Sequence, residues 1–396
     1  MQVLTSAIRD YAWGSRTAIA SIQGRSVPSD GPEAELWLGA HPAAPSALGS
    51  VSLVDAIAAD PAGMLGPAVV DAFGTRLPYL LKLLAAAEPL SLQVHPDATQ
   101  AAAGFAAQEA AGIPRDAPER TYSDPFHKPE VLVAVDEFEA LCGFRDPLVS
   151  AEAIASLDVP PLGRVVAALR SDAEPLREAV RLLTSWPADG RAELVQAVAA
   201  STSSMSTEDA RLAGDLAARY PGDVGVVLAL LLNHVRLRPD EAVWMPAGNL
   251  HMYLRGVGVE IMAASDNVLR GGLTLKHVDV PAVRAVVRYE VLADPVVRPV
   301  AVAPGLVTWP VPVDEFSLHR AALDASTELV LPGRGPRIVL CLRGTARLST
   351  TGVPSGIGSG IDIGAGQAVF VPASDGPVTA AGTALLFQAA PNLAAR

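Results

Sequence analysis

The spacing of apolar positions changes twice along the chain. Short apolar runs broken by proline and glycine fill residues 1–147, and the β-branched stretch 131–135 indicates a strand. Between residues 148 and 238, alanine, leucine, glutamate and arginine dominate, and apolar residues recur at helical spacing, as in 176–186. Strand-like spacing returns after Pro239. The pattern predicts a mainly β protein that carries an all-helical insertion.

One short pattern occurs twice in the chain. Residues 241–248, EAVWMPAG, have a near copy at 367–374, QAVFVPAS. Each predicts a strand closed by a proline turn, a pattern common in cupin (jelly-roll) domains, although a chance match is the alternative. Counting on from the first copy to His251 leads to Pro377 in the second, so the second copy is expected to lack a metal ligand.

These patterns predict two cupin-like β domains and one helical domain. The expected ranges are 1–147 with 239–294 for a catalytic, metal-binding domain, 148–238 for the helical insertion, and 295–396 for a C-terminal domain without metal ligands. Residues 295–310 are expected to link the two β domains. The Gly/Ser-rich stretch 352–366 predicts a long surface loop.

Composition excludes several classes of protein. The chain has 396 residues, of which 50% are hydrophobic and 18% charged, so it is long enough for a large core in more than one domain. A net charge of −12 argues against nonspecific binding to nucleic acid. No secretory signal is visible, and the apolar run 224–232 is too short to cross a bilayer. The two cysteines form no metal or redox spacing, which favours a cytoplasmic protein.

Three separated stretches carry candidate metal ligands. Gln93 and His95 lie two apart in a short run, and residues i and i+2 of a strand project from the same face. Glu130 and His251 belong to two further stretches. Two imidazoles, one carboxylate and one amide oxygen suit Zn²⁺ or a similar divalent ion with an open position for catalysis. Spacing alone leaves a structural role for each histidine open.

Lysine is scarce in this chain. Of 30 basic residues only three are lysines, namely Lys82, Lys128 and Lys276. A bias toward arginine should have replaced lysine wherever the two are interchangeable, and guanidinium cannot imitate a compact ammonium that acts as acid or base. The three survivors are therefore candidate functional residues, with accidental survival as the alternative.

Five motifs occur in order and together resemble the type I mannose-6-phosphate isomerases (phosphomannose isomerases). They are YAWGS at 11–15, AELWLGAHP at 34–42, QVHPD at 93–97, HKPE at 127–130 and VEIMAASDNVLRGGLT at 259–274. The resemblance spans roughly residues 1–290, and the last motif is the most specific. The chain departs from the family pattern at Phe126, Met252, Gly271 and Leu275, where the family usually has Asn, Ala, Ala and Pro. These departures bear on packing and pocket shape.

The resemblance implies an activity and a cofactor. The ligands of one Zn²⁺ per chain would be Gln93, His95, Glu130 and His251. The enzyme would interconvert mannose 6-phosphate and fructose 6-phosphate through a cis-enediol, as an aldose–ketose isomerase of carbohydrate metabolism that serves GDP-mannose biosynthesis. Its partner would be a small sugar phosphate, and it would act as a monomer. The alternative is a non-catalytic or redirected metal-binding cupin that binds a sugar phosphate.

The resemblance also suggests catalytic residues. Lys128, with His127, is the expected acid/base for the substrate hydroxyls. The alternative is that Lys128 only pairs with Asp124 or Glu130. Arg270 is expected at the substrate, where it would stabilise enediolate or phosphate charge. Asp266 and Glu260 compete for the remaining acid/base role, and the sequence leaves the choice open.

Other residues are expected at the edges of the pocket or away from it. Lys82 and Ser91 are candidate phosphate contacts, while Trp13 and Glu35 are expected to line the substrate pocket with Trp37. His41 has an equally good interpretation as a core residue with satisfied hydrogen bonds. His234 is expected at the surface.

Overall fold

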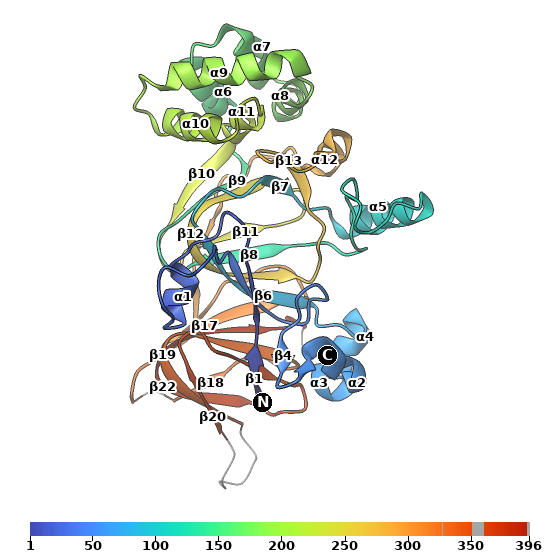
Figure 1. The fold of residues 1–396 in the computed structure, drawn as a ribbon, viewed down its shortest axis with the longest axis vertical. Coiled ribbons are helices and arrows are strands. Elements are labelled where there is room, and N and C mark those ends of the chain that lie inside the picture. Colours follow the sequence, from blue (N-terminus) through green and yellow to red (C-terminus); the bar gives the residue numbers. More distant parts are fainter. Residues whose placement is uncertain (327, 351–359, 394–396) are drawn as a thin grey trace.

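The computed structural model describes residues 1–326, 328–350 and 360–393, and most of them form two antiparallel sheets. Figure 1 shows helices α6–α11 at one end of the molecule, one sheet in the middle and the other sheet at the opposite end. The predicted mainly β fold with a helical segment is confirmed. No helix in the described part of the chain has the length and hydropathy needed to cross a membrane.

The first sheet carries the predicted metal ligands. Its strands follow the order β14-β11-β8-β12-β6-β3-β2, with β7, β9, β10 and β13 off this path. Their bounds are β2 Ala7–Arg9, β3 Glu35–Leu38, β6 Tyr79–Ala86, β7 Leu92–Val94, β8 Glu130–Ala134, β9 Phe138–Phe144, β10 Leu232–Leu237, β11 Ala242–Met245, β12 His251–Ala263, β13 Leu269–Gly272 and β14 Val296–Val297. The long strand β12 joins the main path of the sheet to the strands off it, because its first half pairs with β7 and β9 and its second half with β6 and β8.

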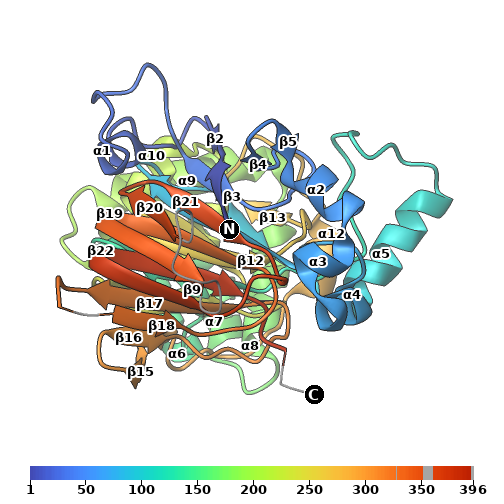
Figure 2. The ribbon, with the colours of Figure 1, turned by 90° about the horizontal axis from the view of Figure 1, so that it is seen from below.

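The second sheet contains mostly C-terminal strands. Its order is β15-β16-β17-β22-β19-β21-β1-β4-β5, with β18 and β20 off this path. Their bounds are β1 Gln2–Thr5, β4 Ala47–Leu48, β5 Val51–Ser52, β15 Val300–Ala303, β16 Leu306–Thr308, β17 Ser317–Leu323, β18 Glu328–Leu331, β19 Arg337–Thr350, β20 Gly360–Gly364, β21 Ala368–Val371 and β22 Val378–Ala390. Figure 2 shows β17, β19 and β22 side by side across the lower face of the molecule.

The helices form one compact group and several single elements. The group consists of α6 Pro147–Ser156, η1 Pro160–Leu162, α7 Gly163–Leu169, α8 Pro175–Thr184, η2 Ala188–Gly190, α9 Arg191–Thr202, α10 Glu208–Arg219 and α11 Gly225–Ala229. The others are α1 Ala18–Ile22, α2 Leu53–Ala59, α3 Pro61–Leu65, α4 Pro67–Phe73, α5 Ala98–Ala110 and α12 Val280–Val286. The group shares a core with Leu92, Val94 and Met252, so it packs on the strands that carry the metal ligands.

Two boundaries differ from the sequence expectation. The helical segment ends at Ala229, and Leu232–Leu237, inside the expected helical range, form β10 along β9. Residues 295–310, expected to be a link, contain β14 of the first sheet and β15 and β16 of the second. Pairing with a distant strand decides the local structure of β10 and β14, while β15 and β16 pair with each other and with β17. Residues 352–359 of the expected loop lie outside the described residues, and the described part, 360–366, includes β20.

The first residues of the chain belong to the second sheet. Strand β1 pairs antiparallel with β21, with Val3 opposite Val369, and β4 pairs with β1. The two sheets then bury one joint core, in which Leu36 and Leu81 of the first sheet join Leu340 and Phe387 of the second. The expected domain of residues 1–147 therefore contains three strands, β1, β4 and β5, that belong to the second sheet.

The repeated pattern gives the same structure twice. Strands β11 and β21 are the two copies, each followed by a proline, Pro246 or Pro372, and then by a long strand, β12 or β22. Both long strands contain a glycine with positive φ, +126° at Gly256 and +136° at Gly382. A Cβ atom would lie 2.7 Å from a carbonyl oxygen at Gly256 and 2.5 Å at Gly382, so only glycine fits either position.

Candidate active site

Three strand ends bring the predicted metal ligands together. His95 follows β7, Glu130 begins β8 and His251 begins β12. All three side chains are buried, and their ligand atoms lie within 4.8 Å of one another. The turn before His251 contributes to this arrangement, because Gly248, with φ +80°, donates its N–H to the His95 carbonyl oxygen at 2.8 Å.

The two imidazoles are arranged to bind a metal ion. Their Nδ1 atoms lie 2.7 Å from the Asn267 carbonyl oxygen for His95 and 2.8 Å from that of Asn249 for His251. Each Nδ1 therefore carries the proton, and each Nε2 offers a lone pair. Both Nε2 atoms are buried and have no hydrogen-bond partner among the described residues, and they lie 3.4 and 3.5 Å from Glu130 Oε2. A divalent cation such as Zn²⁺ would satisfy all three groups.

Electrostatics keep these ligands in their metal-binding forms. Burial, together with the Lys128 charge, lowers the pKa of His95 to about 4, so its imidazole is neutral near pH 7. Burial favours the neutral form of Glu130, but the Lys128 ammonium holds its pKa well below the usual range. Lys128 Nζ lies 2.7 Å from Glu130 Oε1, so the pairing considered from the sequence is present. Its acid/base role stays a prediction.

Gln93 lies between two other predicted site residues. In the strand register it is opposite His251 of β12 on one side and Arg270 of β13 on the other. Residues directly opposite each other in antiparallel strands project from the same face. Gln93 therefore projects from the same face as His251, and its role as the fourth ligand stays a prediction. Arg270 is half-buried on the same face.

A second buried cluster of charges adjoins the metal position. Lys82 Nζ lies 3.0 Å from Glu260 and 3.6 Å from Glu35. Tyr253 Oη donates to Glu260 at 2.9 Å, and Trp37 Nε1 donates to Glu35 at 2.5 Å. Burial disfavours the Lys82 ammonium, but the surrounding carboxylates outweigh it and raise the pKa.

This placement bears on the role expected for Lys82. Its charge is already balanced by two carboxylates, so a contact with phosphate is less favoured than a role inside this cluster. Burial and the neighbouring carboxylates Glu130 and Glu35 raise the pKa of Glu260, against the opposing charge of Lys82.

Trp13 is half-buried at the end of β6, where its carbonyl oxygen accepts the Ala87 N–H at 2.9 Å. Ser91 is half-buried just before β7.

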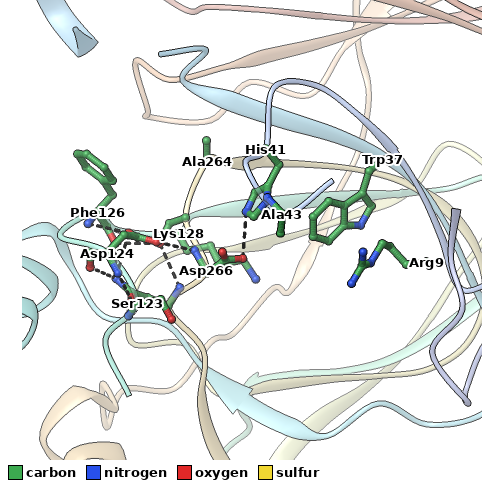
Figure 3. Close-up of polar contacts among 12 residues, drawn as sticks. Arg9, Trp37, His41, Ala43, Ser123, Asp124, Phe126, Lys128, Ala264 and Asp266 are labelled. Atoms are coloured by element: carbon green, nitrogen blue, oxygen red, sulfur yellow. Dashed lines mark hydrogen bonds and ion pairs between the residues drawn. The ribbon is translucent and has the colours of Figure 1, made fainter. Parts of the chain in front are cut away.

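Two loops that carry site residues are hydrogen-bonded to each other (Figure 3). Asp124 Oδ2 accepts the Asp266 N–H at 2.7 Å, and Asp124 Oδ1 accepts the Ser265 hydroxyl at 2.9 Å. The buried Asn267 side chain donates to the carbonyl oxygens of Asp124 and Phe126 at 2.7 and 2.8 Å. Asn267 thus connects this loop to His95, whose Nδ1 contacts its carbonyl oxygen.

His127 differs from the other candidate residues because its partner comes from the C-terminal part of the chain. Its Nε2 lies 2.6 Å from Oε1 of Glu315, which belongs to the C-terminal range that was expected to carry no metal ligands. Sequence reasoning missed Glu315 and Asn267. Asn267 lies within the most specific motif, which was its only signal. Glu315 gave none, because its contact with His127 joins residues 188 positions apart.

Comparisons with known proteins agree with this geometry. A family model described as phosphomannose isomerase type I, catalytic domain, matches residues 1–147. The mannose-6-phosphate isomerase of Salmonella typhimurium is 38% identical over 398 residues, which cover 98% of each chain. Mannose-6-phosphate isomerase 1 of Arabidopsis thaliana is 31% identical and covers 93% of this chain and 89% of its own. A zinc-bound crystal structure of mannose 6-phosphate isomerase is similar with a TM-score of 0.90 at 36% identity, covering 99% of both chains. The chain belongs to the type I phosphomannose isomerase family.

Proposed function

We propose that this chain is a zinc-dependent isomerase that interconverts mannose 6-phosphate and fructose 6-phosphate through a cis-enediol. The observation that carries the proposal is the buried cluster of His95, Glu130 and His251, with two unpartnered Nε2 atoms beside the Lys128 ammonium. Relatives named mannose-6-phosphate isomerase that match nearly the whole chain support it. A cupin without catalysis has no need for the cationic and acidic groups kept around this cluster, so we favour it less.

The metal ion would be held by His95, Glu130, His251 and Gln93. When bound, it supplies Lewis-acid polarisation of the sugar oxygens. Lys128 is close enough to that position to exchange protons with substrate hydroxyls, and its ion pair with Glu130 holds its ammonium there. Lys82 keeps the Glu35 and Glu260 carboxylates paired, which reduces the negative charge facing an enediolate.

We assign the proton transfer between C1 and C2 to Asp266 rather than to Glu260. Glu260 is 2% exposed, and its carboxylate is occupied by Lys82 and Tyr253. The Asp266 side chain is 52% exposed. Burial opposes ionisation of Asp266, but His41, Lys128 and Lys82 hold its pKa below the usual range, so it is ionised near pH 7. An ionised and accessible carboxylate is suited to accept a proton.

We assign the phosphate to Arg270 and Lys276. No carboxylate among the described residues lies within ion-pairing distance of either. Partial burial and the adjacent Arg270 charge lower the pKa of Lys276. In a chain of net charge −12, two neighbouring cations without acidic partners form a local anion site. Ser91, which lies just before β7, is the third candidate phosphate contact. Arg270 and Lys276 take the place of Lys82, which the sequence had suggested as a phosphate contact.

The other expectations follow from the same proposal. We propose that the enzyme acts as a monomer in the cytoplasm and binds no nucleic acid. Its acidic net charge supports the absence of nucleic-acid binding, and its two buried free cysteines support the cytoplasmic location. Its ligand is a small sugar phosphate. Trp13, with Glu35 and Trp37, is proposed to border the sugar.

A coupled assay tests the function directly. Metal-replete protein is given mannose 6-phosphate and several other aldose phosphates, and formation of the ketose phosphate is measured before and after chelation. We expect activity with mannose 6-phosphate that is lost on chelation and restored by one Zn²⁺ per chain. Sugar phosphate binding without turnover would favour the non-catalytic alternative, and full activity in metal-free protein would refute the metal dependence.

A further inference from the structure

His41 points into the candidate active site although its ring is 6% exposed. It follows strand β3, and its Nε2 lies 3.1 Å from Asp266 Oδ1 (Figure 3). Its other nitrogen, Nδ1, accepts the Ala43 N–H at 3.2 Å. A nitrogen that accepts a hydrogen bond from a backbone amide carries no proton, so the imidazole proton is on Nε2. Nε2 therefore donates to Asp266.

The surroundings of His41 fix the ring in this orientation. Its ring packs edge-on against Trp37, with 4.7 Å between the ring centroids and 69° between the planes. Trp37 is itself held by its hydrogen bond to Glu35. The segment that carries His41 is closed by the hydrogen bond from Ser46 N–H to the Gly39 carbonyl oxygen at 2.8 Å. The imidazole donor is therefore preorganised.

Asp266 is held at two points and is open at a third. Its backbone N–H donates to Asp124, and its Oδ1 accepts from His41. Oδ2 has no hydrogen-bond partner among the described residues, and the side chain is 52% exposed. One carboxylate oxygen is thus fixed by the imidazole, while the other is free to meet a substrate.

We propose that His41 is a positioning residue that orients the Asp266 carboxylate and keeps it ionised for proton transfer. The inference rests on the proposed function. Asp266 Oδ2 takes a proton from the substrate and returns it to the product, while His41 keeps its own proton throughout. The other charged groups near Asp266 are the Asp124 carboxylate, which accepts the Asp266 backbone N–H, and the Lys128 and Lys82 ammonium groups, neither of which makes a hydrogen bond to Asp266.

Two substitutions separate positioning from packing. The amide nitrogen of glutamine can replace Nε2, so His41→Gln keeps a donor toward Asp266. The shorter His41→Asn reaches only the Nδ1 position and loses that donor. The matched control is His234, a half-buried histidine whose side chain pairs with a carboxylate, Glu139, at 2.6 Å. It lies on β10 rather than at the site, and its side chain, 8% exposed, lies deeper than the expected surface position.

The readouts are kcat, KM, zinc content, thermal midpoint and the pKa of the Asp266 carboxyl measured by NMR. We expect His41→Asn to lower kcat by about 10- to 100-fold with zinc content unchanged. Loss of the donor should raise the Asp266 pKa and move the acidic limb of the pH–rate profile to higher pH. His41→Gln should restore most of both. The corresponding His234 variants should lower the thermal midpoint while kcat and the acidic limb stay at wild-type values.

Two results would overturn the positioning role of His41. If His41→Asn and His41→Gln lose kcat equally and the Asp266 pKa does not move, His41 only packs against Trp37 and the proposal is overturned. An unchanged kcat in His41→Asn also overturns it. The NMR titration needs no turnover, so it separates the two proposals. If the wild-type protein shows no isomerase activity but His41→Asn still raises the Asp266 pKa, the proposed function is refuted and the orientation of Asp266 by His41 stays supported.

Discussion

The two sheets contain the same strand, proline turn and long strand, but within the described residues a cluster of metal-ligating side chains is found in the first copy alone. In the first sheet, Glu130 of β8 is opposite Met245 of β11. In the second, Arg337 of β19 is opposite Val371 of β21. The two copies thus place a carboxylate and a guanidinium at corresponding positions.

The opposite charges satisfy different groups. Glu130 leaves an oxygen beside two unpartnered imidazole nitrogens. Arg337, 2% exposed, donates its Nη2 to the carbonyl oxygens of Asp375 and Gly376 at 3.0 and 2.9 Å, in the turn that follows β21. The second copy therefore uses its buried charge to hold its own turn, and the first leaves its charge available to an ion. A shared backbone sets where a site can be, and a few side chains decide whether it exists.

The comparison is tested most strongly by removing a ligand from the first copy. His251→Ala should eliminate metal binding and lower kcat by on the order of 10⁴-fold or more, because the Lewis acid is lost. The counterpart Pro377→Ala should keep both. Metal analysis and the coupled assay measure the effect. Equal losses in the two variants would mean that the second copy also supports the site.

The second test concerns the buried cation of the first copy. Lys128→Arg should keep charge and metal yet lose roughly 10²–10⁴-fold in kcat, the range for a lost acid/base group. Guanidinium cannot release a proton at working pH. The measurement is the pH–rate profile. A near wild-type kcat and profile would reduce Lys128 to an ion-pair partner of Glu130.

The buried cation of the second copy should behave in the opposite way. Arg337→Met leaves two carbonyl oxygens without donors and should lower the free energy of unfolding by about 2–4 kcal/mol. Since Arg337 is remote from the metal ligands in sequence and sheet, kcat should stay within about twofold. Denaturant unfolding and the coupled assay on the same sample distinguish the two effects. A large loss of kcat in folded protein would contradict this division of roles.

The smallest expected effect lies where the two regions meet. Glu315→Gln weakens the contact with His127 and should lower kcat by no more than about tenfold, or about 1.4 kcal/mol. The adjacent exposed Asp314 offers a matched control, Asp314→Asn. If Glu315→Gln stops turnover while the fold and metal content persist, the C-terminal range takes part in catalysis.

Strand alternation grouped only Gln93 with His95, and spacing alone left a structural role for each histidine open. The sequence led to the full ligand set through its resemblance to the family, and the structure brings His95, Glu130 and His251 of that set together. The sequence could not predict how charges are neutralised, since that depends on tertiary neighbours. Lys82 was expected at phosphate, but Glu260 faces it from β12 and Glu35 from β3.

Domain grouping was harder to predict for a related reason. The pattern of β1 shows an ordinary short strand, and nothing in it names a partner near residue 370. Likewise, Leu232–Leu237 follow a helix without a break in apolar spacing, and only pairing with β9 makes them a strand. Long-range pairing, rather than local propensity, decided both cases.

The pairing of β1 with β21 also has a consequence for synthesis of the chain. Gln2–Thr5 leave the ribosome long before their partner Ala368–Val371. During translation β1 can pair with β4 soon after both have emerged, but its other edge must stay unpaired until β21 has been synthesised. Contacts of such high sequence separation are formed late and slowly. The second sheet is thus completed late in synthesis, and its assembly joins strands that lie more than 360 residues apart in the chain.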